Sequence, residues 1–144
     1  MISTYLLLAV FGIAMAHVEG VVVVYLRKAL GLIDADKDST GLLEKIPERY
    51  VKIEMTREVA TIVMLVMLAL LVGNGWRDVL MVFLWTFAFW DLFYYLSLYL
   101  VIKWPPKLTT MDVLFLIPRP WIAPVWLPIG ISSLTIIAIA VFYL

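Results

Sequence analysis

The 144-residue sequence contains no cysteine. This absence excludes disulfides, zinc–thiolate centres, iron–sulfur clusters and thiol catalysis, and it leaves the redox compartment open. Charge is also scarce, since only 15% of the residues are charged and eleven Lys and Arg balance eleven Asp and Glu. A chain without a basic surplus is not expected to bind nucleic acid.

What the chain does have is apolar residues, which make up 65% of it and give a mean hydropathy of +1.04. An average soluble domain is nearer half apolar and a quarter charged. A chain this apolar has too little polar surface to cover itself in water. The composition therefore excludes an ordinary soluble domain and predicts a membrane protein.

Four apolar stretches are long enough to cross a bilayer, which takes about 20 helical residues. They cover approximately residues 3–26, 54–72, 79–102 and 124–143. Each stretch is continuously apolar rather than alternating, which favours helices over a β-barrel. We therefore expect an all-α, polytopic membrane protein in which residues 1–144 form a single bundle of four transmembrane helices.

The connection between the third and fourth spans, residues 105–120, is rich in proline. Its apolar run from Met111 to Ile117 is too short to cross a bilayer, and prolines close it on both sides. We therefore expect a short interfacial or re-entrant helix before the fourth span.

The basic residues predict the orientation in the membrane. Ten of the eleven lie in or beside two connections, and the positive-inside rule places such connections in the cytoplasm. We expect loops 27–53 and 103–123 to be cytoplasmic and both termini to lie outside the cell membrane. The ten residues are Arg27, Lys28, Lys37, Lys45, Arg49, Lys52, Arg57, Lys103, Lys107 and Arg119, and only Arg77 lies on the opposite side.

The first span also resembles a secretory signal peptide, because Ala14-Met15-Ala16 imitates a signal-peptidase site. Cleavage there would remove residues 1–16. However, the apolar run continues past this site, and no Lys or Arg precedes it. We expect the segment to be retained as a membrane span.

Several ionisable residues fall inside the spans, where each costs about 2.5–3.5 kcal/mol on insertion scales and faces a protein interior or a watery cavity. In the first span, Gly12, Ala16 and Gly20 form a stripe of small residues that lets two helices approach closely. Glu19 shares that face. We therefore expect Glu19 to point into the bundle.

The second and third spans carry further polar groups at helical spacing. Glu54, Arg57 and Glu58 share one face, so Arg57 can pair with Glu54 and with a neighbouring helix at once. Asp91 and Tyr95 follow each other at i, i+4 and form the pair of greatest interest on the third span. At about 1.5 Å per residue from the cytoplasmic boundary, the depths are roughly 6 Å for Glu58, 10 Å for Glu19 and Tyr95, and 16 Å for Asp91, so these groups can meet.

The predicted site is thus a cluster of carboxylates with too few cations to neutralise it, so some of its members must hold protons or bind a cation. Further residues that would support the cluster are His17, Arg27 as a cationic neighbour, and Asp112. The cluster itself consists of Glu19, Glu54, Arg57, Glu58, Asp91 and Tyr95.

The preferred hypothesis is a small integral membrane subunit of a larger assembly, surrounded by lipids and by other subunits or copies of itself. Its cluster would relay a proton, bind a cation or hold the headgroup of a quinone-like lipid. One alternative is a homo-oligomeric proton- or cation-coupled transporter or channel. Another is a metal-dependent membrane enzyme in which Glu19, Glu58 and Asp91 bind a divalent cation through oxygen ligands.

Two weaker patterns favour ordinary structural roles. The acidic stretch that begins at Asp34 resembles a calcium loop, but Ser39 and Lys45 replace the required Gly and Glu, so a solvated turn is expected. His17 is the only histidine, which excludes a bis-histidine haem within one chain. We expect His17 to form a hydrogen bond between helices.

Overall fold

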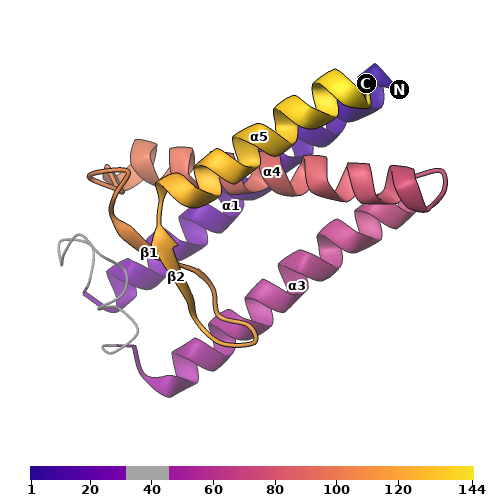
Figure 1. Ribbon diagram of the computed structural model, residues 1–144. Coiled ribbons are helices and arrows are strands. Elements are labelled where there is room, and N and C mark those ends of the chain that lie inside the picture. The colour runs from indigo at the N-terminus through magenta and orange to yellow at the C-terminus, as the bar shows by residue number, and fades with distance from the viewer. Residues whose placement is uncertain (32–45) are drawn as a thin grey trace.

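The computed structural model describes residues 1–31 and 46–144, and helices dominate this part of the chain (Figure 1). The acidic stretch that begins at Asp34 lies outside the described residues. In chain order the elements are α1 (Ile2–Ala29), α3 (Glu48–Val72), α4 (Trp76–Ile102), β1 (Met111–Phe115), β2 (Trp121–Pro124) and α5 (Trp126–Phe142).

Three of the helices, α1, α3 and α4, are long and apolar enough to cross a membrane. Helix α3 begins at Glu48, earlier than the expected span at 54, because the polar residues before the apolar run are helical too. A Lys52–Glu48 ion pair of 2.8 Å, at i, i+4 spacing, supports this first turn. Helix α5 has 17 residues and extends about 25 Å, so it is shorter than the three others.

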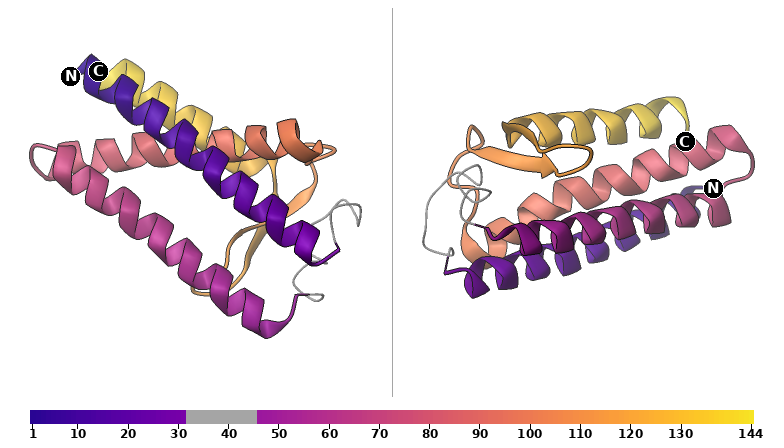
Figure 2. Two further views of the ribbon diagram at one scale, coloured as in Figure 1. Left: turned by 180° about the vertical axis from the view of Figure 1, so that it is seen from behind. Right: turned by 90° about the horizontal axis from the view of Figure 1, so that it is seen from below.

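The described elements have two distinct ends (Figures 1 and 2). At one end, which we call the termini end, the start of α1 and the end of α5 lie near the turn between α3 and α4. At the other, the hairpin end, the last turns of α1 and α4 lie near the two strands and the first turns of α3. In the view from below, α4 lies between α5 and the two helices α1 and α3.

The small-residue face of α1 packs closely on α4, as the sequence predicted. A Cβ atom on Gly12 would lie 3.0 Å from the Cβ of Phe89 and 3.0 Å from the carbonyl oxygen of Thr86. A Cβ atom on Gly20 would lie 3.1 Å from the Oγ of Ser97. The glycines therefore allow the two helix backbones to approach at two levels.

Replacing Gly12 by leucine is expected to lower the free energy of unfolding by about 2 kcal/mol, because the new side chain must push α1 away from α4. Gly130→Leu on α5 is the matched control, since a Cβ there meets nothing within 4 Å. Chemical unfolding of both variants in one detergent measures the difference. Equal losses in the two variants would contradict this account of the packing.

A single carboxylate ties three elements together at the termini end. Asp78, in the first turn of α4, accepts hydrogen bonds from the hydroxyl groups of Tyr5 (3.0 Å) and Tyr143 (2.9 Å). It also accepts one from the backbone N–H of Asn74, at 2.9 Å. Asp78 thus links α1, the turn before α4 and the residue that follows α5.

The prediction of a short helix in residues 105–120 is wrong, because this segment contains strand β1, which pairs with the following β2 in an antiparallel hairpin. Pro118 and Pro120 lack the N–H that a helix needs and bias the residues before them to extended conformations. The hairpin returns along α4, where the Phe115 ring stacks on Phe87 with the ring centroids 6.1 Å apart. The hairpin therefore brings Asp112 and the backbone of Leu116 toward the helices.

Candidate functional site

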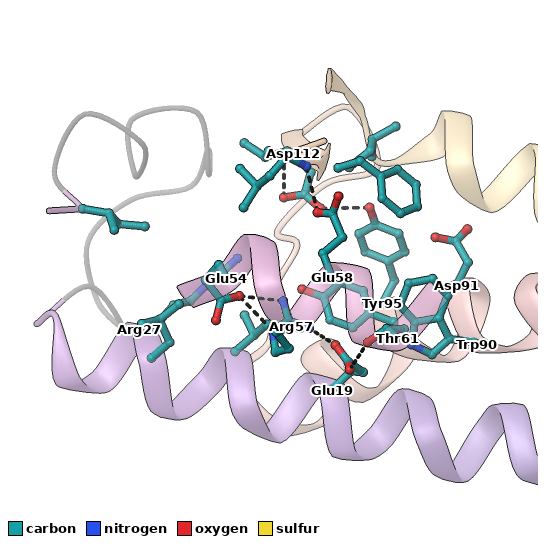
Figure 3. Close-up of a pocket in the computed structure, with 18 residues that line it drawn as sticks. Glu19, Arg27, Glu54, Arg57, Glu58, Thr61, Trp90, Asp91, Tyr95 and Asp112 are labelled. Carbon is teal, nitrogen blue, oxygen red and sulfur yellow. Dashed lines mark hydrogen bonds and ion pairs between the residues drawn. The ribbon is translucent and has the colours of Figure 1, made fainter. Parts of the chain in front are cut away.

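A cavity of about 150 Å³ lies at the hairpin end, enclosed by residues of α1, α3, α4 and β1 (Figure 3). The structure brings the six residues of the predicted cluster to its wall, together with two of the three supporting residues. His17 is the one that does not line it. The eight are Glu19, Arg27, Glu54, Arg57, Glu58, Asp91, Tyr95 and Asp112.

Arg57 bridges two carboxylates on one side of the cavity. Its Nη2 lies 2.6 Å from the Oε2 of Glu54, one turn earlier on α3, and its Nη1 donates to the Oε2 of Glu19 on α1. The hydroxyl of Thr61 donates to the other oxygen of Glu19 at 2.7 Å. As predicted from the helical spacing, Arg57 pairs with Glu54 and with a second helix, and Glu19 faces the bundle with 9% of its surface exposed.

Glu58 connects α3 to the hairpin. Its two carboxylate oxygens accept hydrogen bonds from the backbone N–H groups of Leu116 (2.8 Å) and Ile117 (3.1 Å). These two residues directly follow β1, where the chain turns. An apolar environment makes an unsatisfied N–H costly, so Glu58 stabilises the hairpin turn in its place beside α3. Sequence reasoning placed Glu58 in the cluster but missed this contact because it predicted a helix here.

Asp91 and Tyr95, which lie one turn apart on α4, form hydrogen bonds with different partners. The Tyr95 hydroxyl donates to the Oδ2 of Asp112 on β1, at 2.8 Å. Asp91 instead accepts a hydrogen bond of 2.7 Å from the hydroxyl of Ser132 on α5. The two side chains take different partners because the hairpin covers Tyr95, whereas α5 packs beside Asp91. Ser132, a hydroxyl inside an apolar span, was the sequence signal for that contact.

Arg27 and His17 make contacts of other kinds. The guanidinium of Arg27 lies 4.3 Å from the centre of the Trp104 ring, and 6% of the residue is exposed. The Nδ1 of His17 lies 2.7 Å from the Oγ of Ser97, which confirms the predicted hydrogen bond between helices. His17 therefore helps to join α1 to α4, and Arg27 brings a positive charge to the cavity wall.

The described lining residues carry an excess of negative charge. Five carboxylates, from three helices and the hairpin, face only two guanidinium groups. Within residues 1–31 and 46–144, no ion pair engages Glu58 or Asp91. Carboxylates gathered in a poorly hydrated cavity either bind protons or attract a cation.

The geometry does not support the predicted metal site of Glu19, Glu58 and Asp91. Among the residues that the structure describes, no group of three or more His, Cys, Asp or Glu side chains could hold a metal ion. Each of the three carboxylates is oriented by different donors instead. Arg57 and Thr61 hold Glu19, backbone N–H groups hold Glu58, and Ser132 holds Asp91.

Trp90 contributes a polar atom that sequence reasoning did not single out. The residue lines the cavity, and its indole Nε1 is buried with no hydrogen-bond partner in the described part of the chain. Buried indole N–H groups ordinarily have an acceptor. An oxygen of a bound ligand or of water in the cavity would satisfy it.

Comparison of the chain with models of known protein families, with curated proteins and with solved structures finds no match in any of the three.

Proposed function

We propose that this chain is a small multi-pass integral membrane protein, a subunit of a larger membrane assembly, whose acidic cavity takes up a proton or a cation. The length and apolar character of α1, α3 and α4 support the membrane assignment, and α5 would serve as the fourth span. The distribution of basic residues favours an orientation with the hairpin end in the cytoplasm and both termini outside.

The observation that carries the proposal is the environment of Asp91. Its carboxylate lies at the cavity wall, accepts a hydrogen bond from the Ser132 hydroxyl, and has no cationic partner among the described residues. A lone carboxylate inside a membrane domain is expensive unless it binds a positive charge. Asp91 and Glu58 are thus two carboxylates to which a proton or a cation can bind, one after the other.

Infrared difference spectroscopy of the purified protein after a pH step tests this directly. We expect the wild-type protein to show protonation changes of carboxyl groups, and the Asp91→Asn variant to lose one of these bands. Adding Na⁺ or K⁺ at fixed pH should shift the same band if a cation competes with the proton.

Glu48→Gln is the matched control, because the Glu48 side chain is 82% exposed and lies outside the cavity. This variant should retain the bands assigned to the cavity. Identical spectra for wild-type and Asp91→Asn proteins, under both pH and salt changes, would refute the proposal.

The subunit assignment is tested separately, by purification in mild detergent. We expect other membrane proteins to co-purify with the chain. Isolation as a monomer without partners would contradict the subunit assignment but not the role of the cavity. Isolation as a homo-oligomer would instead favour the alternative of a transporter or channel assembled from identical copies.

A quinone-like lipid headgroup is the second candidate occupant, and it is favoured by the buried N–H of Trp90, which has no acceptor among the residues that the structure describes. A quinone carbonyl oxygen would accept this hydrogen bond, and the rings of Tyr94 and Phe115 on the cavity wall offer surfaces for stacking. Titration with a soluble quinone analogue should quench the fluorescence of the wild-type protein more than that of Trp90→Phe. Equal quenching would exclude this candidate.

A further inference from the structure

A second hollow, an apolar groove of about 350 Å³, runs between α4 and α5 at the hairpin end. Leu92, Leu96 and Tyr99 of α4 line one side of it at i, i+4, i+7 spacing, and Ile129 of α5 lines the other. Tyr95 contributes to both this groove and the acidic cavity. The groove thus lies across Tyr95 from the acidic cavity.

Two lysines give the mouth of the groove a positive charge. Lys107 lines the groove, and the Nζ of Lys103 lies 5.2 Å from the centre of the Tyr99 ring. No Asp or Glu is among the described lining residues. Neither lysine takes part in the ion pairs found in the described chain. Two ammonium groups that form no ion pair within residues 1–31 and 46–144 therefore flank the apolar walls.

The groove begins at the end of α4 and runs back along this helix. Lys103 directly follows the last residue of α4, whereas Leu96 and Leu92 lie two and three turns back along the helix. The segment that carries Lys107 is fixed to α5, because the Trp126 backbone N–H donates to the Leu108 carbonyl at 2.9 Å. The two lysines at the mouth of the groove are thus held at fixed positions relative to its apolar walls on α4 and α5.

We propose that this groove binds one phospholipid with a net negative headgroup. Its phosphate would contact Lys103 and Lys107, and one acyl chain would lie along Leu92, Leu96 and Ile129. The occupant must be amphipathic, since free phosphate would leave the apolar walls uncovered. It must also be anionic, because a zwitterionic headgroup brings its own ammonium group to the two lysines. Anionic lipids are attracted by juxtamembrane basic residues in this way.

Native mass spectrometry of delipidated protein, titrated with phosphatidylglycerol or phosphatidylcholine, tests the proposal. We expect one phosphatidylglycerol molecule to bind more tightly than phosphatidylcholine. The double variant K103Q/K107Q should bind phosphatidylglycerol about thirty-fold more weakly, which corresponds to about 2 kcal/mol for two surface lysines. Leu96→Trp keeps both lysines but fills the groove, and it should weaken binding as well.

The matched control is K28Q/K52Q, which removes two charges from the exposed residues Lys28 and Lys52 away from the groove. It should leave the affinity for phosphatidylglycerol unchanged, as should an excess of inorganic phosphate. Equal binding of the two lipids would overturn the proposal, and so would unchanged binding by K103Q/K107Q. Displacement of the lipid by inorganic phosphate would show a simple phosphate site and would also overturn it.

Discussion

Replacing Arg57 by methionine is expected to lower the free energy of unfolding by about 3 kcal/mol, because the change leaves two carboxylates without their cation. Glu19 and Glu54 both rely on this guanidinium, and their side chains are only 12% and 13% exposed. The Arg57 side chain itself is 29% exposed. The expected loss of stability therefore lies at the lower end of the range that is typical when one partner of a buried ion pair is removed. Denaturant unfolding in detergent, followed by tryptophan fluorescence, measures it.

A double-mutant cycle separates the lost ion pair from lost packing. Glu19→Gln removes one of the stranded charges, so the variant E19Q/R57M should recover part of the stability that Arg57→Met loses. Lys52→Met is the control for removing a cation from α3, since the Lys52 side chain is 71% exposed and pairs with the exposed Glu48. Additive effects of the Glu19 and Arg57 changes would contradict the bridge.

Replacing Glu58 by alanine is expected to release the hairpin turn from α3. The change leaves the N–H groups of Leu116 and Ile117 without their acceptor, at a cost of about 3 kcal/mol. Local opening of the turn should therefore become about a hundred-fold more frequent. Hydrogen exchange at these two amides, read by mass spectrometry, reports the change directly.

Two comparisons make the Glu58 result specific. Glu58→Gln keeps one acceptor oxygen and should show a smaller increase in exchange than Glu58→Ala. Glu48→Ala, on the exposed first turn of the same helix, should leave the exchange of Leu116 and Ile117 as it is in the wild-type protein. Unchanged exchange in Glu58→Ala would show that the turn does not depend on this carboxylate.

The helices and the polar groups that face the bundle interior were largely predictable, because helical periodicity places residues on faces without further information. The stripe of Gly12, Ala16 and Gly20 predicted a close helix contact, and the structure shows it with α4. The i, i+3 spacing of Glu54 and Arg57 predicted their ion pair, and the position of Glu19 on the small-residue face predicted its burial. These are local properties of single helices.

The hairpin and the contacts that depend on it were not predictable in the same way. A short apolar run such as Met111–Phe115 fits a helix or a strand, and its periodicity alone does not predict the pairing of β1 with β2. Because the hairpin was missed, so were its bonds to Glu58 and Tyr95. The partner of Asp91 depended on the packing of α5, which helical spacing alone does not specify.

Helix α1 is fastened to different neighbours near its two ends. Tyr5 donates to Asp78 at the termini end, and Glu19 is bound by Arg57 and Thr61 toward the hairpin end. Sliding α1 along its axis would break both sets of bonds and would also drive Gly12 out of its contact with α4. A piston-like displacement of α1 is therefore opposed at both levels of the helix at once, and so is any change in the cavity that requires it.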